Sequence, residues 1–249
     1  MTFHAWSEED RAGILNPNHV SSRDLLIFDV TNHLLDRYVY SLPADVLSIC
    51  KALGIPVFDT THYQKLGMSK EELFSLWGNR DGAAGRICGQ DVINYNEKAP
   101  GTRARFTLTE ELMHVLLGHT ADHRFSGCPA AYSPELYQRY EREAKTAAGL
   151  ILMPVSVYVG QSSGDSVRGV SVSARDVSAR TWRSDEERIR KLASACGISR
   201  ACAWTTAQYY EGHLEIVRAA ATRKVFQAAR PRHNVVRGIM LTCGESGIV

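Results

Sequence analysis

Apolar residues recur at helical spacing along most of the chain, and short β-branched stretches interrupt them. The helical pattern covers residues 22–38, 41–54, 69–78, 107–118, 137–153, 173–177, 184–193 and 199–207. Three stretches bounded by glycine, proline or asparagine, at 55–59, 85–89 and 91–96, favour strands, and the last two should form a small antiparallel sheet. The pattern predicts a mainly helical α+β fold with a small antiparallel sheet and a C-terminal helical region.

The order of these segments suggests how the chain is organised. We expect an N-terminal arm and helix over residues 1–40 and a core over residues 41–155. Residues 156–210 should form a C-terminal helical part of the same domain, and residues 211–249 a basic helix and tail. A serine- and glycine-rich stretch over 156–169 predicts a loop between the core and the helical part.

The predicted helix over residues 107–118 is almost entirely apolar, yet it carries two adjacent carboxylates. Thr107 followed by Glu110 is a capping-box pattern, which predicts that the helix begins near Thr107. Glu110 and His114 are four residues apart and should share one face, with Glu111 on the flank. A buried ionised carboxylate costs several kcal/mol unless it is paired or ligates a metal. This helix therefore predicts a nearby cation.

A second helix offers a further acidic ligand. Glu141 falls within an apolar stripe on this helix, which Pro154 should end because proline cannot continue it. The two helices can bring Glu110, His114 and Glu141 to one site, with Glu111 beside it.

The two segments resemble the ImmA/IrrE-type metallopeptidases, peptidase family M78, whose pattern is approximately RxRFTxAHExGHxxxH followed by ExxANxFAxxLLMP. The shared residues are Arg103, Arg105, Phe106, Thr107, Glu111, His114, Glu141, Ala144, Ala148, Leu152, Met153 and Pro154. A weaker similarity runs from about residue 44 to about residue 209. The resemblance implies a zincin-like metallopeptidase core in which His114 and Glu141 bind zinc and Glu111 is the general base.

The chain departs from this pattern at the centre of the motif. Glu110 stands where the family has its first zinc-binding histidine, and Met113 stands where it has a glycine. Lys145 replaces an asparagine four residues after the third ligand. An EExxH sequence in place of HExxH therefore raises the question of what position 110 does.

Several assignments of the ligands remain open on the sequence alone. Glu110 can bind the metal or complete the helix cap; as a ligand it gives one imidazole and two carboxylates, which brings Mn or Fe into consideration beside Zn. His119 or His123 can supply the missing imidazole, and Glu143 can substitute for Glu141.

Composition indicates the class of protein and the cellular compartment in which such a site would work. The chain is 44% hydrophobic and 22% charged, as ordinary globular proteins are, and its net charge of +2 argues neither for nor against a polyanionic partner. It has neither a long apolar run nor a signal-peptide pattern at its start, so we expect a cytoplasmic protein that does not span a membrane.

These observations lead to one main functional hypothesis and two alternatives. By the family resemblance, the chain is a metal-dependent endopeptidase that acts on a helix-turn-helix repressor or a similar regulatory protein. The first alternative is a pseudo-protease that binds such a partner without cleaving it. The second is a DNA-binding regulator acting through residues 185–237, which is weaker because Arg200 alone is suitably placed at the second helix of that region.

Overall fold

The computed structural model describes residues 22–39, 41–78, 80–122, 133–160 and 186–213. These residues form a mainly helical α+β fold with a small sheet, as the pattern predicts. The elements are α2 (Ser22–Tyr38), α3 (Val46–Ala52), β1 (Val57–Asp59), α4 (Thr60–Lys65), α5 (Lys70–Leu76), β2 (Gly82–Ile87), β3 (Gln90–Tyr95), α6 (Arg103–Leu116), the 3-10 helix η1 (His119–Ala121), α7 (Pro134–Leu152), α8 (Val155–Gly160), α10 (Glu186–Cys196) and α11 (Arg200–Gly212).

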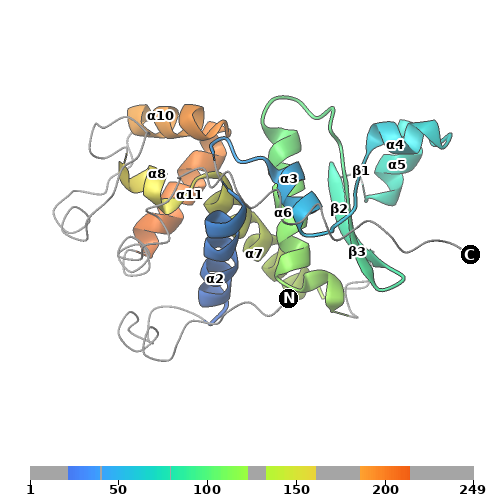
Figure 1. The fold of residues 1–249 in the computed structure, drawn as a ribbon, viewed down its shortest axis with the longest axis horizontal. Helices are drawn as coiled ribbons and strands as arrows, with labels where there is room; N and C mark the ends of the chain where they lie inside the picture. Colours follow the sequence, from blue (N-terminus) through green and yellow to red (C-terminus); the bar gives the residue numbers. More distant parts are fainter. Residues whose placement is uncertain (1–21, 40, 79, 123–132, 161–185, 214–249) are drawn as a thin grey trace, which may run out of the picture.

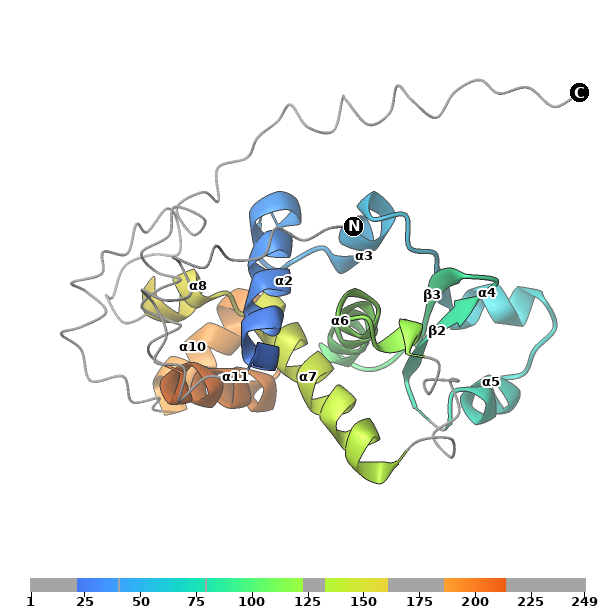
Figure 2. The ribbon, with the colours of Figure 1, turned by 90° about the horizontal axis from the view of Figure 1, so that it is seen from below.

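The central pair of helices is α6 and α7. Helix α6 lies between the sheet and α7, while α2 and α11 contact α7 and α10 packs on α11 (Figure 1, Figure 2). The core around this pair is apolar and includes Leu112, Met113, Ala144, Ala148 and Ile151, all completely buried. A helix with so little polar surface is stable only inside the protein, and the two motif helices are therefore held at the middle of the molecule.

The sheet has the strand order β1-β3-β2. Strands β2 and β3 pair antiparallel, with Gly82 opposite Tyr95 and Ile87 opposite Gln90, which confirms the predicted antiparallel pair. Strand β1, whose pairing was not predicted, runs parallel to β3, so the sheet as a whole is mixed. Helices α4 and α5 join the end of β1 to the start of β2 at one end of the sheet, where Asp59 and Gly82 both pair with Tyr95. Strand β2 then runs back, and the hairpin turn makes β3 parallel to β1.

The predicted start of α6 is wrong by one turn. The helix begins at Arg103 rather than Thr107, because a turn at Pro100 and Gly101 (φ 60°) lets the N–H of Arg103 bond to the carbonyl oxygen of Pro100. Thr107 is therefore inside the helix and buried. Glu110 lies in the third turn and cannot cap the helix, which contradicts the capping alternative.

Some of the other predicted helices and loops are confirmed, and others are not. The capping box of Ser69 and Glu72 at the start of α5 is confirmed, as are the helices at α2, α10 and α11. Helix α4 was not predicted, and α8 occupies the first part of the stretch predicted as a loop. The predictions for residues 1–20, 161–169, 173–177 and 217–243 lie outside the described residues.

Within the described part of the chain, no helix combines the length and apolar character needed to cross a membrane.

Candidate metal centre

Glu110 and His114 from α6 meet Glu141 from α7 between the two helices. Each residue offers one ligand atom, and these three atoms lie within 4.8 Å of one another. The Nε2 atom of His114 is 3.7 Å from Oε1 of Glu141. Ligands bound to one ion at about 2.1 Å stand roughly 3–4 Å apart, so small side-chain movements would complete the group around a cation. A set of one imidazole and two carboxylates fits a divalent metal ion.

Local sequence signals fix where α7 presents Glu141. The helix begins with Pro134 after Ser133, whose hydroxyl accepts a hydrogen bond from the N–H of Leu136 at 3.2 Å. It ends at Leu152, with Met153 as the capping residue just before Pro154, and Pro154 therefore closes the helix as predicted. Glu141 therefore lies two turns into the helix, where α7 packs against α6.

Two basic side chains accompany the carboxylates. Nζ of Lys145 is 2.9 Å from Oε2 of Glu141 and 3.6 Å from Oε1 of Glu110. Nη1 of Arg80, which precedes β2, is 3.3 Å from Oε1 of Glu141 and donates to the hydroxyl of Tyr137 at 3.0 Å. The acidic residues thus have protein cations beside them. Lys145 lies one turn after Glu141 on the same helix, whereas Arg80 lies 61 residues from Glu141 and was not predicted, because no local sequence signal connects the two.

Burial and charge set different pKa values for the two carboxyl groups. Burial raises the pKa of Glu110 to about 7, although Lys145 opposes the shift. Burial also acts to raise the pKa of Glu141, but hydrogen bonding to Lys145 and the proximity of His114 outweigh it and lower that pKa. Burial and His119 lower the pKa of His114 to about 3. His114 is therefore a neutral imidazole at neutral pH, the form that ligates metals.

Glu111 lies on the other flank of α6, against the outer edge of β2. Its carboxylate accepts a hydrogen bond from the N–H of Ala84 at 2.6 Å and is buried. Burial, together with neighbouring Glu110, raises the pKa of Glu111 to about 8. A cation beside such a group lowers its pKa and favours the ionised form that a general base requires.

His119 and Glu143 lie on the far side of His114 from Glu141. Gly118 (φ 77°) turns the chain after α6, and Nδ1 of His119 comes within 3.0 Å of Nδ1 of His114. Nε2 of His119 is 3.1 Å from Oε2 of Glu143. The structure therefore does not bring either residue to the ligand atoms of Glu110 and Glu141, and His123 lies outside the described residues.

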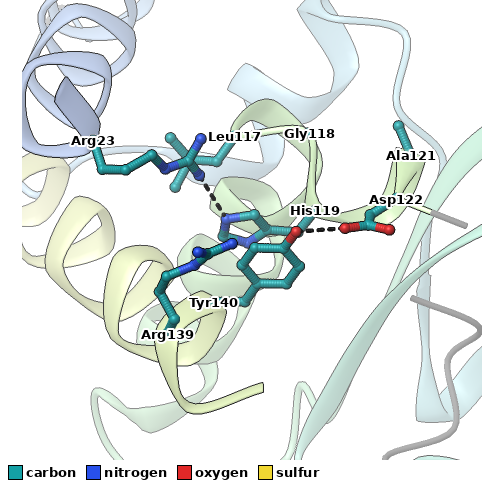
Figure 3. Close-up of a pocket in the computed structure, with 8 residues that line it drawn as sticks. All are labelled: Arg23, Leu117, Gly118, His119, Ala121, Asp122, Arg139 and Tyr140. Atoms are coloured by element: carbon teal, nitrogen blue, oxygen red, sulfur yellow. Dashed lines mark hydrogen bonds between the residues drawn. The ribbon is translucent and has the colours of Figure 1, made fainter. Parts of the chain in front are cut away.

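The outer side of His119 borders a pocket of about 490 Å³. Its lining includes Arg23, His119, Asp122, Arg139 and Tyr140 (Figure 3). Although burial opposes the shift, the hydrogen bonds from His119 and Arg23 lower the pKa of Glu143 to about 2. The pocket is separate from the candidate metal centre, because Glu110, His114 and Glu141 are not among its lining residues.

Comparison with known proteins gives one family match. Residues 50–158 match the family model Peptidase_M78, described as the IrrE N-terminal-like domain. No curated protein matches the chain significantly. The matched residues include both α6 and α7 and hence Glu110, Glu111, His114 and Glu141. Over residues 50–158 the chain is therefore similar to the IrrE N-terminal-like domain of the Peptidase_M78 family.

Proposed function

We propose that this protein is a metal-dependent endopeptidase of the ImmA/IrrE type. The observation that carries the proposal is the meeting of Glu110, His114 and Glu141 between α6 and α7, within a region similar to a metal-dependent peptidase family. Zinc is the first candidate for the ion, and manganese or iron follow because two of the three ligands are carboxylates.

The residues around this group have separate roles in the proposed reaction. A bound divalent ion supplies Lewis-acid polarisation of a peptide carbonyl and activation of a water molecule. Glu111 would act as the general base that accepts a proton from the attacking water and passes it to the leaving amine. Strand β2 is an edge strand with its outer side at Glu111, and an extended peptide pairing with this edge would lie beside that carboxylate.

The family resemblance extends the proposal to a substrate class. We infer that the substrate is a protein, and specifically a helix-turn-helix repressor or a similar regulatory protein. Support for this partner comes from the resemblance of residues 103–118 and 140–154 to ImmA/IrrE-type peptidases.

The proposed function is tested by metal content and by cleavage. Elemental analysis of purified protein should find about one divalent ion per chain, and His114→Ala should lose it. Incubation with a proteome-derived peptide library should then produce new peptide termini, detected by mass spectrometry. Glu111→Gln should bind the ion and yet form no termini. Absence of both the metal and the termini in the wild type would overturn the proposal.

The position of Lys145 favours a second candidate function, in which the protein binds a regulatory partner without cleaving it. An ammonium 2.9 Å from Glu141 provides a counterion where the peptidase would hold its metal. In that case the wild type holds no metal, whereas Glu110→His combined with Lys145→Asn creates zinc binding. A wild-type protein that holds metal and cleaves peptides rules this candidate out.

A further inference from the structure

A line of buried side chains leads away from His114 on the side opposite Glu141. His114 contacts His119 through their Nδ1 atoms at 3.0 Å, and His119 contacts Glu143 through Nε2 and Oε2 at 3.1 Å. All three residues are at least nine-tenths buried, with 2%, 1% and 7% of their surfaces exposed. Contacts this short between buried polar groups must be hydrogen bonds with a defined donor and acceptor.

The hydrogen positions along this line follow from its outer end. The guanidinium groups of Arg23 and Arg139 flank the Glu143 carboxylate, which therefore acts as an acceptor. His119 must donate to it from Nε2. Since a neutral imidazole carries one hydrogen, Nδ1 of His119 is then an acceptor, and His114 must donate to it from Nδ1.

One neighbouring contact competes with this assignment. Nη2 of Arg23 is 3.4 Å from Nε2 of His119, and a donor there would favour a lone pair on that nitrogen. However, Nε2 would then face Oε2 of Glu143 as a second acceptor only 3.1 Å away. Arg23 also donates from its Nε to Glu143 at 3.1 Å, so the carboxylate already satisfies this guanidinium.

The ring of His119 is held in place by its surroundings. Tyr140 stacks on it with ring centroids 4.1 Å apart and an angle of 10° between the planes. The hydroxyl of Tyr140 donates to Oδ2 of Asp122 at 2.6 Å (Figure 3). His119 therefore presents Nδ1 to His114 and Nε2 to Glu143 in a fixed orientation.

We propose that His119 and Glu143 are positioning residues that hold His114 in the Nδ1–H tautomer, with the lone pair of Nε2 on the side of Glu141. Nε2 is the atom of His114 that lies 3.7 Å from Glu141. The tautomer is a property of the metal-free protein, whereas its consequence for metal affinity rests on the proposed function. Partners of this kind orient ligating histidines and raise their basicity.

The tautomer can be measured directly on the full-length, metal-free protein. Long-range ¹H–¹⁵N spectra of protein labelled at histidine should show His114 carrying its hydrogen on Nδ1. His119→Phe keeps a flat ring but removes both nitrogens, and it should abolish this preference. His119→Gln should restore it, because the amide oxygen accepts from His114 while the amide nitrogen donates to Glu143.

Metal titration gives the second readout. Co²⁺ titration followed by visible absorption should show affinity lowered about 10- to 100-fold in His119→Phe and largely recovered in His119→Gln. If His119→Phe does not fold, Glu143→Gln takes its place and should give a mixture of His114 tautomers. An Nε2–H tautomer in the wild type, or a His114 spectrum of His119→Phe (or of Glu143→Gln in its place) identical to that of the wild type, overturns the proposal. If the wild type shows the Nδ1–H tautomer but does not bind Co²⁺, the proposed metal-dependent function is wrong while the assignment of the tautomer stands.

Discussion

The amine of Lys145 is the side chain that most distinguishes this site from the family pattern. It lies between Glu110 and Glu141, 3.6 and 2.9 Å from their oxygens, and its side chain is about half exposed. A divalent ion bound by the same carboxylates would be repelled by this positive charge. Metal binding must therefore displace the ammonium toward solvent, which weakens the affinity.

Replacing Lys145 with asparagine, the family residue, should strengthen metal binding. We expect Lys145→Asn to raise Zn²⁺ affinity by about tenfold or more, equivalent to about 1.4 kcal/mol, because a repulsive charge is removed. Competition against a chromophoric chelator measures the change. Lys191→Asn is the matched control, because Lys191 is an exposed lysine of α10 that pairs with Glu187. Equal affinities for wild type and Lys145→Asn would contradict this account.

At the residue scale, the spacing of residues within a helix predicted which side chains would meet. Contacts between segments far apart in the sequence could not be predicted in this way. The four-residue separation of Glu110 and His114, with Glu141 on a second helix, predicted that these side chains would meet. Nothing local connects Glu141 with Arg80, or Glu111 with the N–H of Ala84 27 residues earlier. The capping pattern of Thr107 and Glu110 failed because an upstream turn starts the helix earlier.

At the scale of elements, α6 and β2 lie close together at Gly82. A Cβ atom at this position would lie 2.6 Å from Cγ2 of Thr107, 3.0 Å from the carbonyl oxygen of Asn94 and 3.1 Å from Cγ of Glu111. The absence of a side chain therefore lets the strand lie directly against the helix that carries the candidate site.

Adding a methyl group at Gly82 should force this contact apart. We expect Gly82→Ala to lower the free energy of unfolding by about 1–3 kcal/mol, since overpacking displaces neighbouring atoms. Chemical denaturation measures the loss. Gly85→Ala on the same strand is the control and should cost less, because a Cβ there meets nothing within 4 Å. Similar losses in the two variants would argue against close packing of α6 on β2.

Helix α4 depends on a carboxylate from a distant loop. Glu97 accepts hydrogen bonds from the N–H and hydroxyl of Thr60, at 2.9 and 2.6 Å, and from the hydroxyl of Thr61 at 2.6 Å. Burial opposes ionisation, but these bonds lower the pKa of Glu97 to about 2. The start of α4 is thus stabilised by the ionised form.

This contact predicts how stability changes with pH. Because the folded-state pKa of about 2 lies below the unfolded value of about 4.3, Glu97 stabilises fully above about pH 5, and this contribution is lost as the pH falls toward 2. Glu97→Gln should cost about 1–2 kcal/mol at pH 7, allowing for solvent screening, and less at about pH 3.5. Urea denaturation at both pH values tests this, with Glu71→Gln on the exposed surface of α5 as control. A pH-independent difference would exclude this role.

The contact between Glu97 and α4 illustrates why some elements could be predicted from the sequence and others could not. Strands β2 and β3 and helix α5 follow from local alternation, turn residues and a capping box, so their prediction succeeded. Helix α4 has six residues, and Glu97, one of its stabilising groups, lies 37 residues away from Thr60. Parallel pairing of β1 with β3 is likewise decided by tertiary packing, which the order of elements alone does not give.

On the scale of the whole molecule, α7 joins two groups of elements. Its middle carries Glu141 and Lys145. Its end meets α11, where the hydroxyl of buried Tyr210 donates to the carbonyl oxygen of Met153 at 2.7 Å. Helices α10 and α11 lie beyond the family match and still share the core of α7. The two groups should therefore unfold together.

Removing the Tyr210 hydroxyl tests this connection. Tyr210→Phe should lower the free energy of unfolding by about 1–2 kcal/mol, because the buried carbonyl of Met153 loses its partner. Tyr158→Phe is the control: its hydroxyl donates to Glu211 at 3.1 Å, a half-buried carboxylate that water can reach, so the loss should be smaller. Unfolding monitored by fluorescence and circular dichroism should remain a single transition, and two separate transitions would show independent units.

Arg80 and Lys145 also affect whether the protein needs a metal ion in order to fold. Because these two bases accompany the carboxylates of the metal-free chain, a newly synthesised polypeptide can reach its native state before any ion arrives. Chelators should then strip the centre without denaturing the protein, unlike a zinc finger, whose folding needs the ion. Under the proposed function, the supply of metal ions would then determine what fraction of the folded molecules carries an ion.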